Sequence, residues 1–205
     1  EERLVRLLDA GLSSVAISLD GLEEDHNWMR GHENSYQNAM RAIKLMARTR
    51  GVVWDVVTCV NGRNIKYLPK LKETLYAAGV RKWRLFSIFP VGRAKQYPDF
   101  QLSDTDFLYM MDFIKECRSE SKSGSSSSPM HVSYACEGFL GDYEMEVRDT
   151  FYRCHAGINV ASILIDGSMS ACTSIRSKFY QGNIYKDDFW DVWDNRFHNY
   201  RYRDW

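Results

Sequence analysis

Short apolar runs and longer amphipathic stretches alternate along residues 1–118 of the chain. The apolar runs are rich in β-branched residues and predict strands buried on both faces of a parallel sheet; they lie at 14–21, 52–60 and 80–88. Helical periodicity predicts helices at 1–10, 35–49, 68–78 and 104–118. Successive strands begin roughly 28 to 38 residues apart, which fits βα units with right-handed crossovers.

The predicted fold class is therefore α/β, with successive βα units in a parallel sheet. Three strands cannot close a barrel, and the chain begins at Glu1 inside an amphipathic pattern and stops at Trp205 without a stop signal. We expect a piece of a longer protein, with a sheet edge that favours self-association. No Gly-x-Gly-x-x-Gly follows any strand, which disfavours a Rossmann dinucleotide site.

Residues 119–129 are serine-rich and predict a flexible linker. Residues 130–150 predict a fourth strand followed by an acidic, helical connection. In residues 151–205 we expect a small region with a β-hairpin, a turn at 181–183 and an aromatic helix at 187–200.

Two cysteines, Cys154 and Cys172, flank the predicted hairpin. Residues 158–165 form an apolar strand-like run, and Asp166-Gly167 is a strong signal for a tight turn. A hairpin folded there brings the two cysteines towards each other. Their spacing alone is compatible with a metal or cluster site, a disulfide, or ordinary buried cysteines.

Composition and charge exclude several classes of partner. The 205 residues are 44% hydrophobic, and 27 basic residues balance 27 acidic ones. Zero net charge gives no electrostatic support for a nucleic-acid or membrane-surface partner. No apolar run is long enough for a membrane span, and the five scattered cysteines do not resemble a secreted disulfide framework. We therefore expect a reducing, cytoplasmic setting.

Polar residues gather where the predicted strands end. Ser18 and Asp20 end the first strand, and Arg30 follows in what we interpret as a loop. In parallel sheets and barrels ligands bind at this end, so Asp20 suits sugar hydroxyls and Arg30 suits a carboxylate. The alternative is that Ser18 and Asp20 only terminate a strand. We interpret His26 as a solvated loop residue.

Several motifs follow one another in a fixed order: Ala16–Gly21 with Arg30-Gly31, Trp83–Phe86 with Pro90–Ala94, Cys154-x12-Gly167-x4-Cys172, Gln181–Ile184, and Phe189–Trp193. Together they resemble the radical S-adenosylmethionine enzymes that carry a C-terminal SPASM auxiliary-cluster domain. The resemblance spans nearly the whole chain, and the ordered set is more specific than any single block.

The resemblance implies S-adenosylmethionine, 4Fe-4S clusters and a partial (β/α) TIM-like barrel of the (β/α)6 type. Residues 1–118 would form about the second half of that barrel, and residues 130–150 its last strand and connecting helix. The resemblance further implies that Ser18 and Asp20 lie near the cofactor's ribose or the substrate and that Arg30 lies near its carboxylate. The backbone around Phe89 and Pro90 would flank the adenine. Cys154 and Cys172 would ligate the auxiliary cluster. Because such enzymes often modify peptides or proteins, the resemblance also implies a peptide or protein substrate.

The chain departs from the family pattern in its cluster ligands. It contains no C-x3-C-x2-C and no Gly-Gly-Glu-Pro-like segment, so we expect this chain alone to be inactive. Only two auxiliary ligands are recognisable; Cys136 is a candidate third, and Cys59 and Cys117 are expected core residues.

Two other interpretations compete with the family assignment. One is a non-catalytic α/β domain whose cysteine hairpin, with His155, binds structural zinc or docks a partner. The other, weaker one is a sugar-phosphate barrel enzyme, which lacks a glycine-rich phosphate site here.

Overall fold

The computed structural model describes residues 2–125, 127, 129–135, 138–172, 174–175 and 179–202. The chain divides into two compact units, Glu1–Tyr152 and Arg153–Trp205. Each unit has its own cluster of buried apolar side chains.

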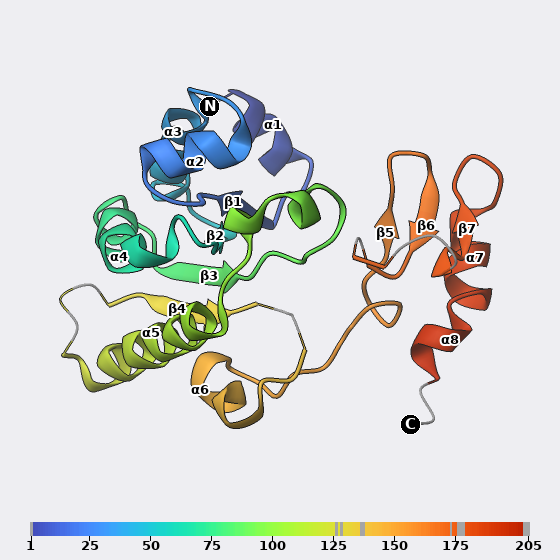
Figure 1. Cartoon of the computed structure of the whole chain (residues 1–205). Coiled ribbons are helices and arrows are strands. Elements are labelled where there is room, and N and C mark those ends of the chain that lie inside the picture. Colours follow the sequence, from blue (N-terminus) through green and yellow to red (C-terminus); the bar gives the residue numbers. More distant parts are fainter. Residues whose placement is uncertain are drawn as a thin grey trace. The chain divides into compact units, whose positions relative to one another are not determined.

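The first unit is built on a parallel sheet in which strand order follows chain order (Figure 1). Its strands are β1 (Ser14–Ser18), β2 (Val53–Cys59), β3 (Lys82–Phe86) and β4 (His131–Tyr134). Its α-helices are α1 (Glu2–Asp9), α2 (Glu23–Arg30), α3 (Ser35–Met46), α4 (Leu68–Ala77), α5 (Asp104–Ser123) and α6 (Glu144–Val147). Short 3-10 turns are η1 (Ile65–Tyr67), η2 (Gly92–Gln96), η3 (Pro98–Phe100) and η4 (Gly141–Tyr143). The α/β prediction with parallel βα units is confirmed.

The two faces of this sheet differ in character. On one face Val56, Trp83, Leu85 and Val132 are fully buried and join the core formed with the helices. Fully burying one such aliphatic side chain stabilises the fold by roughly 1.5–3 kcal/mol. Alternate residues point to the opposite face, where β2 and β3 are only half-buried. The helices therefore cover one face of the sheet and leave the other open.

Helix α2 was missed by the sequence analysis, which expected a loop there. Its eight residues are almost all polar and give no clear apolar stripe. The helix is stabilised by acidic residues in its first turn and by Gly31, which adopts the left-handed conformation as its C-cap.

Helix α5 is longer than predicted. It begins with a capping box between Ser103 and Asp106 and continues to Ser123, where Gly124 ends it in the left-handed conformation. Residues 119–123, expected in the flexible linker, therefore belong to the helix. Serine is tolerated in a last turn whose preceding residues Cys117 and Arg118 are buried.

The second unit holds a three-stranded antiparallel sheet, β5 (Ser162–Ile163), β6 (Ser168–Ser170) and β7 (Gly182–Asn183). The predicted hairpin at Asp166-Gly167 is confirmed: Gly167 has φ +79°, and Asp166 accepts a hydrogen bond from the Ser168 amide. Its first arm is shorter than predicted.

Two further predictions for this unit were wrong in detail. The expected turn at 181–183 contains β7, which pairs with β6. The expected aromatic helix is divided into α7 (Phe189–Asn195) and α8 (His198–Arg201), because Phe197 turns into the core with no exposed surface. None of the helices in the described residues is both long and apolar enough to cross a membrane.

Candidate functional site

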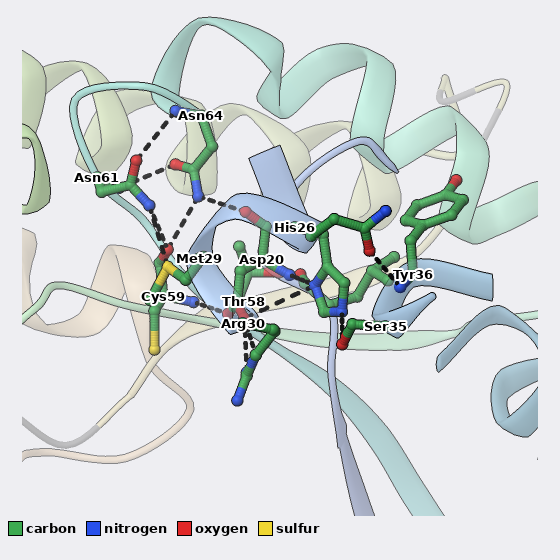
Figure 2. A network of polar contacts seen from close by, with 12 residues as sticks. Asp20, His26, Met29, Arg30, Ser35, Tyr36, Thr58, Cys59, Asn61 and Asn64 are labelled. Carbon is green, nitrogen blue, oxygen red and sulfur yellow. Dashed lines mark hydrogen bonds and ion pairs between the residues drawn. The ribbon is translucent and has the colours of Figure 1, made fainter. Parts of the chain in front are cut away.

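A buried carboxylate lies just beyond the end of β1. Asp20 is wholly buried, and its Oδ1 accepts a hydrogen bond of 2.9 Å from the Cys59 amide at the end of β2. Its Oδ2 accepts from Arg30 Nε at 2.6 Å and lies 2.5 Å from Arg30 Nη2, as Figure 2 shows. Both carboxylate oxygens therefore have donors from the protein, and Asp20 fixes the guanidinium at the strand ends.

His26 supports Asp20 from α2. The ring is 1% exposed; its Nδ1 accepts from the Asp20 amide at 2.9 Å and its Nε2 lies 3.0 Å from Ser35 Oγ (Figure 2). Because Nδ1 accepts a hydrogen bond from an amide, the proton of the neutral ring belongs on Nε2. Burial lowers the pKa of His26, although Asp20 opposes the shift. The ring is thus a neutral support for the Asp20 backbone.

A second support comes from the turn after β2. Asn64 Nδ2 donates to the carbonyls of Asp20 at 2.7 Å and Cys59 at 2.9 Å, and Asn64 Oδ1 accepts from the Asn61 amide at 2.8 Å. Thr58 adds a further link, since its hydroxyl donates to the Leu19 carbonyl at 2.6 Å. These side-chain hydrogen bonds link the carboxyl ends of β1 and β2 in addition to the backbone hydrogen bonds between the two strands.

The structure brings together two of the predicted site residues, Asp20 and Arg30. The Arg30 side chain is 38% exposed, so the held cation remains open to a ligand. Ser18 is the half-buried last residue of β1. Phe89 and Pro90 are exposed in the loop that follows β3. An exposed guanidinium backed by a buried carboxylate can bind a carboxylate or phosphate group.

Three supporting residues were not recognised from sequence: His26, Ser35 and Asn64. The prediction that His26 is a solvated loop residue was wrong, because it rested on the missed helix α2. Thr58 and Asn61 were expected among the polar residues at the carboxyl end of the second strand, but Asn64 was not singled out. Asparagine side chains that bond to nearby backbone were the available signal.

The second unit holds Cys154 and Cys172, which are both half-buried and pack against its core. They form no disulfide. Two thiols supply half of the four ligands that iron–sulfur clusters take. No group of three or more His, Cys, Asp or Glu that could hold a metal occurs within the described ranges. His155 is exposed, and Cys136 lies outside the described residues.

Comparison with known families identifies the second unit. Residues 154–205 match the SPASM family, described as an iron-sulfur cluster-binding domain. The cysteine pair and its glycine thus lie in a domain whose relatives bind iron–sulfur clusters.

Curated relatives extend the similarity to the first unit. The chain is 22% identical to Fe-coproporphyrin III synthase and 23% identical to AdoMet-dependent heme synthase, both of Methanosarcina barkeri. These matches cover 94% and 95% of this chain but 51% and 57% of the relatives. A third, the sporulation killing factor maturation protein SkfB of Bacillus subtilis, is 29% identical over 58% of this chain and 28% of its own length. The chain therefore spans about half or less of the curated relatives it matches.

Solved structures share the fold. Streptococcus suis SuiB, bound to precursor peptide SuiA, matches with a TM-score of 0.58 and 13% identity over 93% of this chain and 44% of its own. Polyhistidine-tagged anSMEcpe with bound AdoMet matches with a TM-score of 0.58 and 17% identity over 97% of this chain and 55% of its own.

Proposed function

Because the chain belongs to the radical S-adenosylmethionine enzymes that carry a SPASM domain, we propose that the protein is an iron–sulfur oxidoreductase or a peptide or protein maturase. S-adenosylmethionine at a reduced 4Fe-4S cluster supplies, when bound, a 5′-deoxyadenosyl radical that abstracts a substrate hydrogen. The chain has no C-x3-C-x2-C, so its residues do not fit that cluster. On this proposal the ligands lie elsewhere in a longer protein, and this chain alone is inactive.

The observation that carries the cofactor proposal is the Asp20–Arg30 pair at the carboxyl end of β1. In this proposal Arg30 binds the carboxylate of S-adenosylmethionine, and Asp20 fixes the guanidinium in position. The burial of Asp20 changes its proposed role, because both of its oxygens are already bonded to the protein. It orients the cation and does not itself contact ribose. Ser18 and the backbone at Phe89 and Pro90 remain proposed cofactor contacts.

Cys154 and Cys172 are proposed ligands of an auxiliary 4Fe-4S cluster. The match of residues 154–205 to a cluster-binding domain supports this assignment. The chemistry of the pair fits, since cysteine thiolates hold such clusters and both residues lie at an apolar core. The remaining ligands would come from outside the described residues. Cys154 and Cys172 would hold the cluster, and the apolar core beneath these two residues would limit access by water.

Two classes of substrate are in keeping with the relatives. A peptide or protein is our first proposal, supported by the precursor peptide bound to SuiB and by the maturation protein SkfB. A tetrapyrrole is the second, supported by the two synthases that match nearly the whole chain. Candidate peptides and candidate tetrapyrroles should be tested separately for stimulated formation of 5′-deoxyadenosine, and the class that stimulates it identifies the substrate class.

The first test is the coding sequence on both sides of this chain. Three further βα units need about 90 residues upstream, at about 30 residues each. A C-x3-C-x2-C at the start of that stretch would support the proposal. A reading frame whose upstream and downstream segments both lack such cysteines would refute it.

The second test is made in the protein with its flanking sequence, purified without oxygen. We expect Arg30→Lys to weaken S-adenosylmethionine binding about tenfold, because lysine keeps the charge beside Asp20 but lacks the planar fork. The matched control is Arg41→Lys, on the exposed side of α3. Equal affinity in both variants would contradict the role of Arg30.

The third test concerns the cysteine pair. Cys154→Ala or Cys172→Ala should lower the iron content while leaving the radical cluster, and Cys117→Ala, a buried residue of the first unit, is the control. Unchanged iron and visible absorption would remove the ligand assignment. Zinc in place of iron would favour the structural alternative.

A further inference from the structure

The open face of the parallel sheet carries charged side chains. Parallel strands usually present apolar residues on both faces, because both are normally covered. Here Asp55, Arg84 and Ser133 lie on three neighbouring strands, on the face opposite the apolar core: Arg84 is the register partner of Ser133, and Asp55 lies two positions before Val57, the register partner of Arg84 on β2. Such a row must line water or a ligand, since charge buried against apolar atoms is costly.

Four possible hydrogen-bond donors form a compact group on β3 and β4. Arg84 is the register partner of Ser133, and Lys82 is the register partner of His131. Neighbouring strands are about 4.8 Å apart, and alternate residues of one strand are about 6.6 Å apart. The four side chains therefore leave the same face within a patch of about 5 by 7 Å. That patch is small enough for several of them to reach one ligand group.

The acidic residues beside this patch are already engaged. Asp55 is bonded by Nε and Nη2 of Arg84, and Asp149 accepts from Arg118 at 2.8 Å and lies 2.9 Å from His131 Nε2. The hydrogen bond from Arg118 leads the effects that lower the pKa of Asp149, so it stays ionised. Because both carboxylates already have partners in the protein, neither makes this patch a strong site for an added cation.

The cations, in contrast, remain accessible. The Arg84 side chain is 41% exposed, whereas that of Asp55 is 16% exposed. Lys82 has no ion pair among the residues that the structure describes. A cavity of about 360 Å³ lies over this patch and is lined by Asp55, Lys82, Arg84, His131, Ser133 and Asp149. Lys82 supplies positive charge that no described carboxylate offsets, and Arg84, although paired with Asp55, is exposed and can donate further hydrogen bonds; together they favour an anion.

The geometry points to an oxyanion site at the amino-terminal ends of β3 and β4, in which Lys82, Arg84 and Ser133 bind a carboxylate or phosphate group. It lies at the other end of the strands from Asp20, and it does not rest on the proposed radical chemistry. Asp55 and Asp149 are positioning residues that hold Arg84 and His131.

The test uses the 205-residue chain and two probes, inorganic phosphate and succinate, at constant ionic strength. Titration followed by amide chemical shifts should give saturable changes in β3 and β4. Lys82→Gln should weaken binding about tenfold, since about 1.4 kcal/mol corresponds to a factor of ten. Lys66→Gln, at an exposed lysine on η1, is the matched control and should leave the affinity unchanged.

A double variant, Asp55→Asn with Arg84→Gln, removes the second cation without leaving an unpaired carboxylate, and it should also weaken binding. Saturable binding of phosphate alone would assign a phosphate group, and binding of succinate alone would assign a carboxylate. Linear, non-saturating shifts with both probes would overturn the inference. So would equal affinities in Lys82→Gln and Lys66→Gln.

Discussion

The Asp20–Arg30 pair should respond unequally to loss of its two partners. Asp20 is wholly buried, whereas the Arg30 side chain is 38% exposed. Arg30→Met leaves a buried carboxylate without its cation, which costs about 3–5 kcal/mol. Asp20→Asn still accepts the bond from the Cys59 amide and lets Arg30 turn to water, so only a charge-assisted bond is lost, about 1.5–3 kcal/mol. Arg30→Met should therefore be the more destabilising change.

Amide hydrogen exchange of the buried amides in β2 measures this difference within the first unit, unaffected by the second. Under conditions where exchange reports opening free energy, Arg30→Met should lower protection more than Asp20→Asn. Arg41→Met, on the exposed surface of α3, controls for loss of a guanidinium. The reasoning is refuted if Asp20→Asn lowers the opening free energy of β2 as much as Arg30→Met does. The difference in burial between Asp20 and Arg30 would then have no effect on stability.

Three further changes test separate parts of the chain. Burial lowers the pKa of His26 below its ordinary 6.5, so the neutral ring stabilises the fold fully above pH 6.5 and this contribution is lost as pH falls towards the folded-state pKa. Urea unfolding at several pH values should show this loss, and His26→Phe should remove it. Glu144→Gln should cost about 3–5 kcal/mol in the same assay, because it leaves Arg148, itself 7% exposed, with a buried unpaired charge. Gly167→Ala should speed amide exchange in β6, since Gly167 has φ +79° and a Cβ would lie 2.5 Å from the Tyr185 ring.

The sheet and most of the helices could be predicted because their signals are local. Apolar runs at 52–60 and 80–88 are β2 and β3, and the amphipathic periods that follow are α4 and α5. Helix α2 was not predicted, because it has no clear apolar stripe and the tertiary contacts of His26 add to the stabilisation by its acidic first turn and its Gly31 cap. The end of α5 was misplaced for another reason: its serine-rich last turn was interpreted as a linker, whereas the helix continues to its left-handed cap at Gly124.

The candidate site was predicted only in part, for a related reason. Asp20 and Arg30 were singled out because polar residues end an apolar strand, which is visible in sequence. That Asp20 is buried and bonded across to Cys59 depends on the register of β1 against β2, which no single segment encodes. The contribution of Asn64, 44 positions further along the chain, was invisible for the same reason.

The sequential strand order has a consequence for how the protein is made. Each strand of the first unit pairs with the strand that precedes it in the chain, so every pairing closes a single βα loop. A growing chain can dock one unit at a time from its amino terminus during synthesis. Until residue 134 has left the ribosome, however, β3 keeps one edge without its β4 partner. Nascent chains paused in that interval should expose the edge of β3, which the complete first unit covers with β4.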